Sequence, residues 1–448
     1  MRANMTASNA LLQEVSDARM LTLLQRYLEK QPEYKQSLKS IRLCGSLLLH
    51  APLWQTSVAV VSNGKHSRLF GQATCHSSWA CPKCTAKVMA KYGTRIACAI
   101  DALSKWYNQK CVMITFTLPH TNKMSAKDAF TVLKNTWTAF SHGGNRRGSK
   151  RKWTRKDGTE TEYTCGQQAY GKMREELNIR HNVRVYEFTW GENGWHPHIH
   201  ALFWIPADKF DRIIDYEESL NELWWRTAKN QSLKYYKDKE YVDQLYADYK
   251  YTPKTGHKSV YISRDKNGKP KQQKSSNYIV DWSGDYELTA NLKTARKGHY
   301  TPRELLEKAW YDKPNRDKWL GLYAEYALAT RGAKRVHFSA RSGINDIVKQ
   351  WKLSNEYIEL LKKKVTDKGV GEWKLVVWFT AEQWSDISLV DKTKTYLISR
   401  IIALSHRRNA KELITKLLLR YDIDISQNGE HYNQHDIEQL IFENRYAS

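Results

Sequence analysis

The chain has 448 residues, in which 72 Lys and Arg outnumber 47 Asp and Glu to give a net charge of +25. This length suggests about three domains, and so large a positive excess favours an extended polyanion as partner, nucleic acid first and an anionic membrane surface second. Hydrophobic residues make up 41% of the chain, which excludes disorder over most of it.

The predicted elements begin with a helical arm over residues 1–40, followed by a small metal-stabilised module over residues 41–100 that includes a β-like piece at Thr56–Ser62. The seven Cys are an odd number, and three of them crowd between residues 75 and 84. This spacing indicates a metal cluster in a reducing compartment. With no predicted signal peptide and no apolar run of about 18 residues, we expect a cytoplasmic protein that does not bind membranes.

The middle of the chain, residues 101–300, is expected to form an α+β domain. Strands are predicted at Cys111–Leu118, Asn182–Trp190 and Trp195–Ile205, the last two joined by a hairpin turn at Gly191–Gly194. Helices are predicted after the first and after the last of these strands, at Ser125–Phe140 and Phe210–Lys229. Antiparallel strands with interspersed helices are typical of this fold class.

Two insertions in this domain are strongly basic, at residues 145–158 and 229–274. The first is predicted to be a loop whose cations follow phosphates while Trp153 stacks on a base, although a solvated loop is as good an interpretation. Residues 301–448 are predicted to be mainly helical, for example at Thr393–Leu404 and Lys411–Tyr421. They would serve duplex DNA recognition or self-association, including a dimer on the DNA.

Alternate histidines form the sharpest local motif, with His196, His198 and His200 placed to project from one face of a strand. A metal site of His/carboxylate type needs a third ligand, and the preceding strand offers Glu187.

The register of the hairpin decides which histidine Glu187 faces. A turn at Asn193-Gly194 places Glu187 opposite His200, whereas a turn at Glu192-Asn193 places it opposite His198. Either register predicts a metal site. Such a set also suits non-haem iron, but oxygen chemistry does not explain the charge of +25. A hard divalent ion can instead polarise a phosphate oxygen, and chemistry on the phosphates of a polyanion fits the charge of +25.

The sequence resembles the plasmid rolling-circle replication initiators of the HUH endonuclease superfamily. The resemblance rests on ordered motifs from about Cys44 to Trp384, namely Cys44-Gly45, Cys75–Cys84, Thr115–Leu118, Gly194–His200, Asn277–Ile279, Arg296–Gly298, Thr301–Leu306 and Glu325–Ala327.

This resemblance implies a palm of antiparallel strands on which Glu187, His198 and His200 hold Mg²⁺ or Mn²⁺. His196 would be a further ligand or would orient the others. Tyr278 would be the nucleophile, which cuts one strand at the plasmid origin, stays joined to the 5′-phosphate, leaves a 3′-hydroxyl primer and later rejoins the displaced strand.

The chain departs from the family pattern on both sides of Tyr278. Family members often place Glu four residues before this tyrosine and Lys three after it, where this chain has Lys274 and Asp281. We expect Asp281 to assist the terminating attack by water and Lys274 to steady the phosphate or the phenolate. In the alternative, Ser275, Ser276 or Asn277 caps a helix that leaves Lys274 outside it.

A structural zinc site is predicted at Cys75, Cys81 and Cys84, whose C-x5-C-x2-C spacing gives the tight bite that a tetrahedral ion needs. The resemblance makes Cys44 the preferred fourth ligand, with His50 and His76 as alternatives.

Further DNA contacts are expected from cationic and aromatic side chains in two basic tracts. They are Arg146, Arg147, Lys150, Arg151, Lys152, Trp153, Arg155, Lys293, Arg296 and Lys297.

Because the chain contains no G-x-x-x-x-G-K-[ST] motif, a helicase and a polymerase of the prokaryotic host would have to be recruited. An HUH transposase or relaxase, and an origin-binding regulator that has lost cleavage, are the alternative functions.

Overall fold

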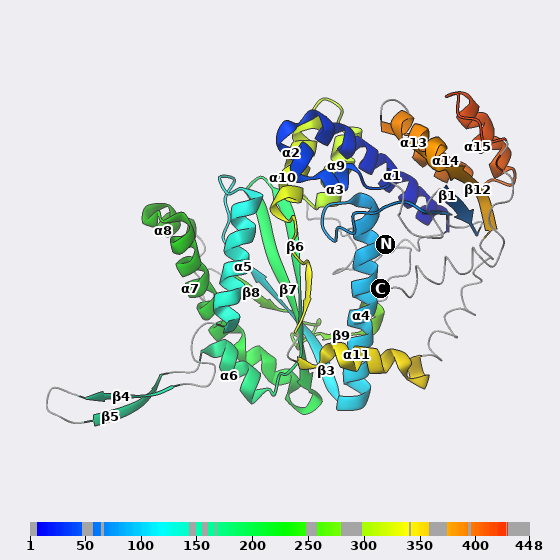
Figure 1. The fold of residues 1–448 in the computed structure, drawn as a ribbon. Coiled ribbons are helices and arrows are strands. Elements are labelled where there is room, and N and C mark those ends of the chain that lie inside the picture. The colour runs from blue at the N-terminus through cyan, green and yellow to red at the C-terminus, as the bar shows by residue number, and fades with distance from the viewer. Residues whose placement is uncertain are drawn as a thin grey trace.

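A computed structural model describes the greater part of the chain and shows a mixed α+β fold with antiparallel sheets, as predicted (Figure 1). The described residues are 7–46, 57–63, 67–142, 149–154, 160–165, 168–247, 258–278, 298–339, 342–357, 374–392, 396–426 and 428.

The centre of the fold is a seven-stranded sheet whose paired strands are all antiparallel. The strand order is β10-β6-β7-β3-β8, with β11 also paired to β6 and β9 also paired to β3. The strands are β3 (Gln109–Thr117), β6 (Asn182–Gly191), β7 (Gly194–Pro206), β8 (Val260–Ile262), β9 (Gln272–Gln273), β10 (His299–Tyr300) and β11 (Val336–Phe338). The three predicted strands correspond to β3, β6 and β7.

The hairpin between β6 and β7 has one of the two predicted registers. Gly191 pairs with Gly194, so Glu192 and Asn193 form the turn and Glu187 lies opposite His198. Gly194 has φ +85°, and a Cβ atom there would lie 2.7 Å from the carbonyl oxygen of Thr121. This close approach of two backbones requires glycine at the start of β7.

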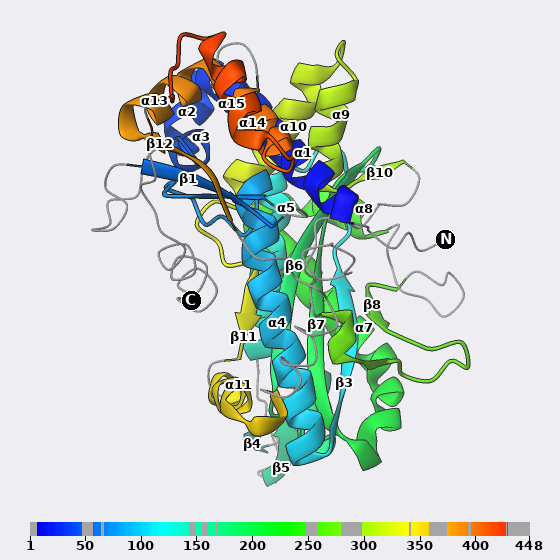
Figure 2. The same cartoon turned by 90° about the vertical axis from the view of Figure 1, so that its right-hand side faces the viewer.

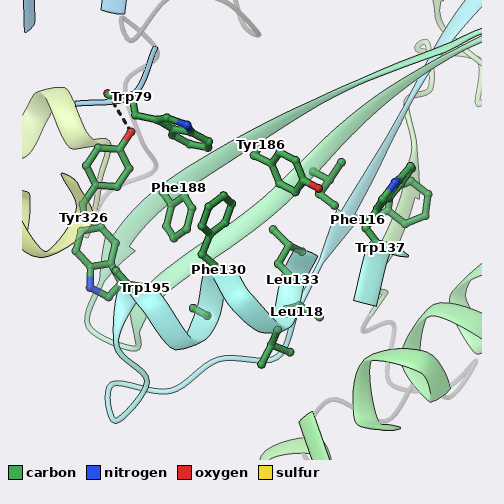
Figure 3. Close-up of a cluster of buried hydrophobic side chains, with 14 of the residues drawn as sticks. Trp79, Phe116, Leu118, Phe130, Leu133, Trp137, Tyr186, Phe188, Trp195 and Tyr326 are labelled. Atoms are coloured by element: carbon green, nitrogen blue, oxygen red, sulfur yellow. Dashed lines mark hydrogen bonds between the residues drawn. The ribbon is translucent and has the colours of Figure 1, made fainter. Parts of the chain in front are cut away.

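One face of the sheet is covered by α5 (Ala126–His142) and α7 (Glu217–Tyr236). Aromatic side chains dominate this core, and Figure 3 shows Phe130 of α5 among them. The ring of Phe130 meets Tyr186 at 5.6 Å and Phe188 at 5.4 Å, both edge-on. Such edge-to-face pairs add to the stabilisation that burial of the rings provides.

The opposite face of the sheet packs against the long helix α4 (Pro82–Tyr107) and against α11 (Ile344–Leu353) (Figure 2). Because side chains alternate along a strand, this face carries Cys111, Leu202 and Trp204 in the core. The three alternate histidines of β7 share this face with Leu202 and Trp204.

A separate three-stranded sheet joins distant parts of the chain. β1 (Ser57–Ser62) pairs with β2 (Ser67–Phe70) and with β12 (Lys374–Thr380). Its buried side chains pack with α13 (Ala381–Val390), α14 (Leu397–Leu404) and α15 (Ala410–Leu419). A strand of the predicted zinc module is thus completed by the C-terminal region. The division of the chain at residues 40, 100 and 300 stays a prediction.

The remaining helices lie mostly at the ends of the central sheet. They are α1 (Ala7–Lys30), α2 (Pro32–Ser37), α3 (Lys39–Arg42), α6 (Ala169–Glu176), α8 (Lys239–Ala247), α9 (Pro302–Tyr311) and α10 (Arg316–Ala329), with 3-10 segments η1 (Ala207–Tyr216) and η2 (Ser275–Asn277). Residues after 301 are mainly helical where the structure describes them, but they also supply β11 and β12, which the sequence analysis did not predict. Within the described residues, no helix combines the length and the apolarity needed to cross a membrane.

The first basic insertion differs from the predicted loop. β4 (Ser149–Thr154) and β5 (Glu160–Cys165) form a two-stranded antiparallel sheet. In Figure 1 this hairpin projects away from the body of the protein. The prediction weighed only the charge of this segment, and charge does not distinguish a hairpin from a loop.

Candidate functional site

Glu187, His198 and His200 come together on the α4 face of the central sheet and form a group that can hold a metal ion. Glu187 Oε2 lies 3.2 Å from Nε2 of His198 and 3.2 Å from Nε2 of His200. The cross-strand pairing of Glu187 with His198 sets the first distance, and the two-residue period of β7 brings His200 to the same face. Two imidazoles that direct nitrogen toward one carboxylate oxygen match the donors of a His/carboxylate metal site.

The electrostatics of this group favour an ionised carboxylate. Burial by itself would raise the pKa of Glu187, but the charge of His200 and hydrogen bonds from both histidines hold that pKa well below its usual range. A deprotonated carboxylate is the form that binds a divalent ion.

Thr115 of β3 orients one of the imidazoles. It lies opposite His200, and its Oγ1 is 2.8 Å from Nδ1 of that histidine. When Nδ1 donates its proton to Thr115, Nε2 keeps the lone pair that a metal ligand needs. The residues present therefore fit a divalent ion, while the kind of ion stays a prediction.

His196 lies beside this group without belonging to it. Its ring stacks on His120 with centroids 4.6 Å apart and planes 10° apart, and it lies 5.4 Å from the ring of His198. Burial lowers the pKa of His120. The sequence analysis missed His120 because it stands alone after Pro119, and only the packing of the loop after β3 shows that it meets the histidine strand.

Tyr278 lies on the same side of the sheet, but it is buried. Only 1% of its surface is exposed, and its hydroxyl donates a 2.9 Å hydrogen bond to Oε1 of Gln273. Gln273 pairs with Cys111, four residues along β3 from the position opposite His200, which is about 13 Å along the strand. Tyr278 thus belongs to the same core as Trp204 and α4.

Of the two residues expected to flank Tyr278, one lies within the described residues. Lys274 is exposed, has an extended backbone and precedes η2, so it lies outside the turn, as in the alternative interpretation. Asp281 lies outside the described residues.

The four cysteines Cys44, Cys75, Cys81 and Cys84 form a second group that can hold a metal ion. Sγ of Cys44 lies 3.6 Å from Sγ of Cys84 and 3.6 Å from Sγ of Cys81. Hydrogen bonds from the other thiols, that of Cys44 first, lower the pKa of Cys84. A thiolate is the form of cysteine that binds zinc.

The two histidines considered as alternative fourth ligands are not found in this group. His76 is exposed and lies 3.1 Å from Oγ1 of Thr74, and His50 lies outside the described residues. The structure therefore places Cys44, the preferred candidate, beside the three clustered cysteines.

The loop that carries the cysteines is tied to the strand of Glu187. Tyr326 of α10 donates a hydrogen bond to the carbonyl of Trp79 (Figure 3). Arg335 donates to the carbonyls of Ser78 and Tyr186. Because Tyr186 precedes Glu187, Arg335 links the cysteine loop to the backbone next to Glu187.

Most of the cationic residues expected to contact DNA lie outside the described residues. These are Arg146, Arg147, Arg155, Lys293, Arg296 and Lys297. Of the others, Lys150, Arg151, Lys152 and Trp153 lie on β4 of the projecting hairpin. Their contact with DNA stays a prediction.

Comparison with known proteins finds a partial relative. A neomycin resistance protein from Streptomyces cyanogenus is 28% identical over 149 residues, a match that covers 30% of this chain and 30% of that protein. No family model matches the sequence, and no solved structure matches the chain. The fold and its two groups of potential metal ligands thus define an α+β protein with antiparallel sheets and two candidate metal centres.

Proposed function

We propose that the protein initiates rolling-circle replication of a plasmid, as a nicking and joining enzyme of the HUH endonuclease superfamily. The observation that carries the proposal is the convergence of Glu187, His198 and His200 on one face of an antiparallel sheet. The charge of +25 supports a polyanionic substrate, and the ordered motifs make that substrate plasmid origin DNA, single-stranded at the nick.

A divalent ion, Mn²⁺ or Mg²⁺, held by these three residues would polarise a phosphate oxygen. Zn²⁺ held by the four cysteines would have a structural role, because a closed set of protein ligands leaves no position for substrate.

Tyr278 would supply the nucleophile. Its hydroxyl loses a proton, the oxygen attacks phosphorus, and the bond from phosphorus to the 3′-oxygen breaks. The 3′-oxygen takes up a proton and becomes the primer, while the 5′-phosphate stays on the tyrosine. For this step the hydroxyl of Tyr278 has to leave Gln273, so binding of DNA is expected to release the segment that follows β9.

Several proposed contributions concern residues around this reaction. Lys274 would steady the phosphate, and Asp281 would assist the terminating attack by water. The basic residues of β4 and of the tract at 293–297 would hold the strand. Replication would then need a helicase and a polymerase from the host.

A cleavage-deficient regulator that binds the origin is the second candidate, and the burial of Tyr278 is the observation that favours it. An HUH transposase or relaxase would share the metal group and differ in the DNA that it cuts.

The test is to incubate the protein with Mn²⁺ and labelled single-stranded oligonucleotides that tile the replicon carrying its gene, and then to look for label on denatured protein. The proposed function predicts an adduct that needs the metal and is lost in both His198→Ala and Tyr278→Phe. Cleavage without an adduct would indicate a hydrolytic nuclease. Tight binding of one oligonucleotide without cleavage would establish the regulator instead.

A further inference from the structure

A second tyrosine, Tyr261, lies on the metal-binding face of the central sheet. It is the middle residue of β8, and it pairs with Thr115 of β3. Its neighbours Val260 and Ile262 point into the α5 and α7 core. Because side chains alternate along a strand, Tyr261 points to the opposite face, the face of Glu187 and the histidines.

The row of residues across the sheet places Tyr261 close to the metal group. Thr115 pairs with His200 on one side and with Tyr261 on the other. The Cβ atoms of directly opposed residues lie about 5 Å apart, and two strand spacings put the Cα atoms of Tyr261 and His200 about 10 Å apart. A phosphate bound at the metal group is therefore within reach of an extended tyrosine side chain.

Tyr261 and Tyr278 differ sharply in accessibility. Tyr261 is 45% exposed, whereas Tyr278 is 1% exposed. Within the described residues the hydroxyl of Tyr261 has no hydrogen-bond partner, while that of Tyr278 is bound to Gln273. Of these two phenols, only that of Tyr261 is available to substrate without rearrangement of the core.

The strand that carries Tyr261 is held rigidly against α7. Asn221 accepts hydrogen bonds from the backbone nitrogens of Ser259 and Val260, each 2.8 Å long. Glu217 accepts from the nitrogen of Ile262 at 2.9 Å. Functional side chains on such anchored strands are positioned more precisely than those on loops.

Two cations flank Tyr261 and are fixed by the same helix. Lys258 and Arg264 each form a 2.8 Å ion pair with Glu217. These ion pairs tie both ends of β8 to α7 on the face opposite to Tyr261, so they help to fix the position of the strand that carries it.

From this arrangement we infer that Tyr261 is a second nucleophile for the Glu187, His198 and His200 group. This inference rests on the proposed function. While Tyr278 carries a 5′-phosphate, the hydroxyl of Tyr261 would lose its proton and attack the phosphorus of a second junction. The bond to the 3′-oxygen of that junction would break and its oxygen take up a proton, so that a new 5′-phosphate is joined to Tyr261. The released 3′-hydroxyl then loses its proton and attacks the phosphorus of the phosphotyrosine at Tyr278; the bond from phosphorus to the tyrosine oxygen breaks, Tyr278 takes up a proton, and the displaced strand is closed.

Mass spectrometry of the adducts separates the two tyrosines, because trypsin releases them on different peptides. Tyr261 lies on residues 259–264 and Tyr278 on residues 275–293. The experiment uses the full-length protein with Mn²⁺ and an oligonucleotide that contains two copies of the cleaved junction. We expect nucleotide on both peptides in the unmodified protein, and loss of it from residues 259–264 in Tyr261→Phe.

The matched control is Tyr311→Phe, which removes a hydroxyl from a tyrosine that is 79% exposed on α9. It should leave both adducts at their original yield. Nucleotide on residues 275–293 alone, at equal yield in Tyr261→Phe and the unmodified protein, would overturn the inference and leave the proposed function standing. Absence of any cleavage would instead contradict the proposed function, and the inference with it.

A second measurement tests the geometry without any reaction. In protein labelled with 3-fluorotyrosine, the ¹⁹F resonance of Tyr261 is the one missing from Tyr261→Phe. Mn²⁺ should broaden this resonance beyond detection, and His198→Ala combined with His200→Ala should abolish the broadening. A Tyr261 resonance that stays sharp when Mn²⁺ saturates the unmodified protein would place the tyrosine away from the metal group and refute the inference.

Discussion

The hydrogen bond between Thr115 and His200 should control how tightly the metal group binds a divalent ion. Thr115→Val keeps the shape of the side chain and removes the oxygen that lies 2.8 Å from Nδ1 of His200. His200 is only 5% exposed, so water cannot easily replace the lost partner. Removing the partner of a buried donor costs about 1–3 kcal/mol. Loss of such an orienting contact typically weakens metal binding about 10- to 100-fold, and the two estimates agree.

The assay is titration with Mn²⁺ followed by electron paramagnetic resonance of the free ion. Thr117→Val is the matched control, because Thr117 lies two residues along the same strand, opposite His198. Among the described residues, its side chain has no hydrogen bond to that histidine. We expect Thr115→Val to raise the Kd for Mn²⁺ about 10- to 100-fold and Thr117→Val to leave it nearly unchanged. A Kd for Thr115→Val within about twofold of the original would refute the assigned role of Thr115.

Three further predictions concern metal content, pH dependence and the core. Cys84→Ser should lower the amount of zinc bound per chain, measured by mass spectrometry of the metal. It should also reduce the free energy of unfolding, because metal binding contributes to folding. An unchanged zinc content would remove Cys84 from the ligand set. Burial lowers the pKa of His337 to about 4 from 6.5, so the unfolded chain takes up this proton first and the free energy of unfolding should fall as pH drops from 6.5 towards 4. The urea midpoints at pH 7 and pH 5 should therefore differ less in His337→Gln than in the unmodified protein. An equal difference in the two proteins would count against this role of His337. Phe130→Ala removes a ring that is 1% exposed and should destabilise the protein by about 3–5 kcal/mol in urea unfolding; a loss below about 1 kcal/mol would show that the core repacks.

The metal groups were accessible to sequence reasoning because local patterns carry them. The two-residue period of the histidines places them on one face of any strand, and the short spacing of Cys81 and Cys84 closes a tight chelate. The partner of Glu187 stayed open between His198 and His200, since either turn fits the sequence. In the register that the structure shows, Gly194 lies close to the backbone of Thr121. The sequence around the turn gives no indication of this contact between distant parts of the chain.

Tyr261 and the burial of Tyr278 could not be predicted in the same way. Tyr261 is one of 26 tyrosines and lies in a strand of three residues, too short for a periodic pattern. Its role as a candidate arises only from the pairing of β8 with β3. The core around Tyr278 is built from α4, β7 and β9, which are distant in sequence. Long-range packing of this kind overrides what a local motif suggests.

The small sheet has a consequence for synthesis of the protein. Ser57 of β1 pairs with Thr380 of β12, so the hairpin of β1 and β2 emerges from the ribosome about 320 residues before its partner strand. At roughly 5–20 residues per second, that interval lasts about 15 to 65 s. During this time one edge of β1 is open, and the apolar side chains of Val58 and Val60 lack the helices that later bury them. Unpaired edges of this kind promote aggregation, so nascent chains should depend on a chaperone until α15 has been made.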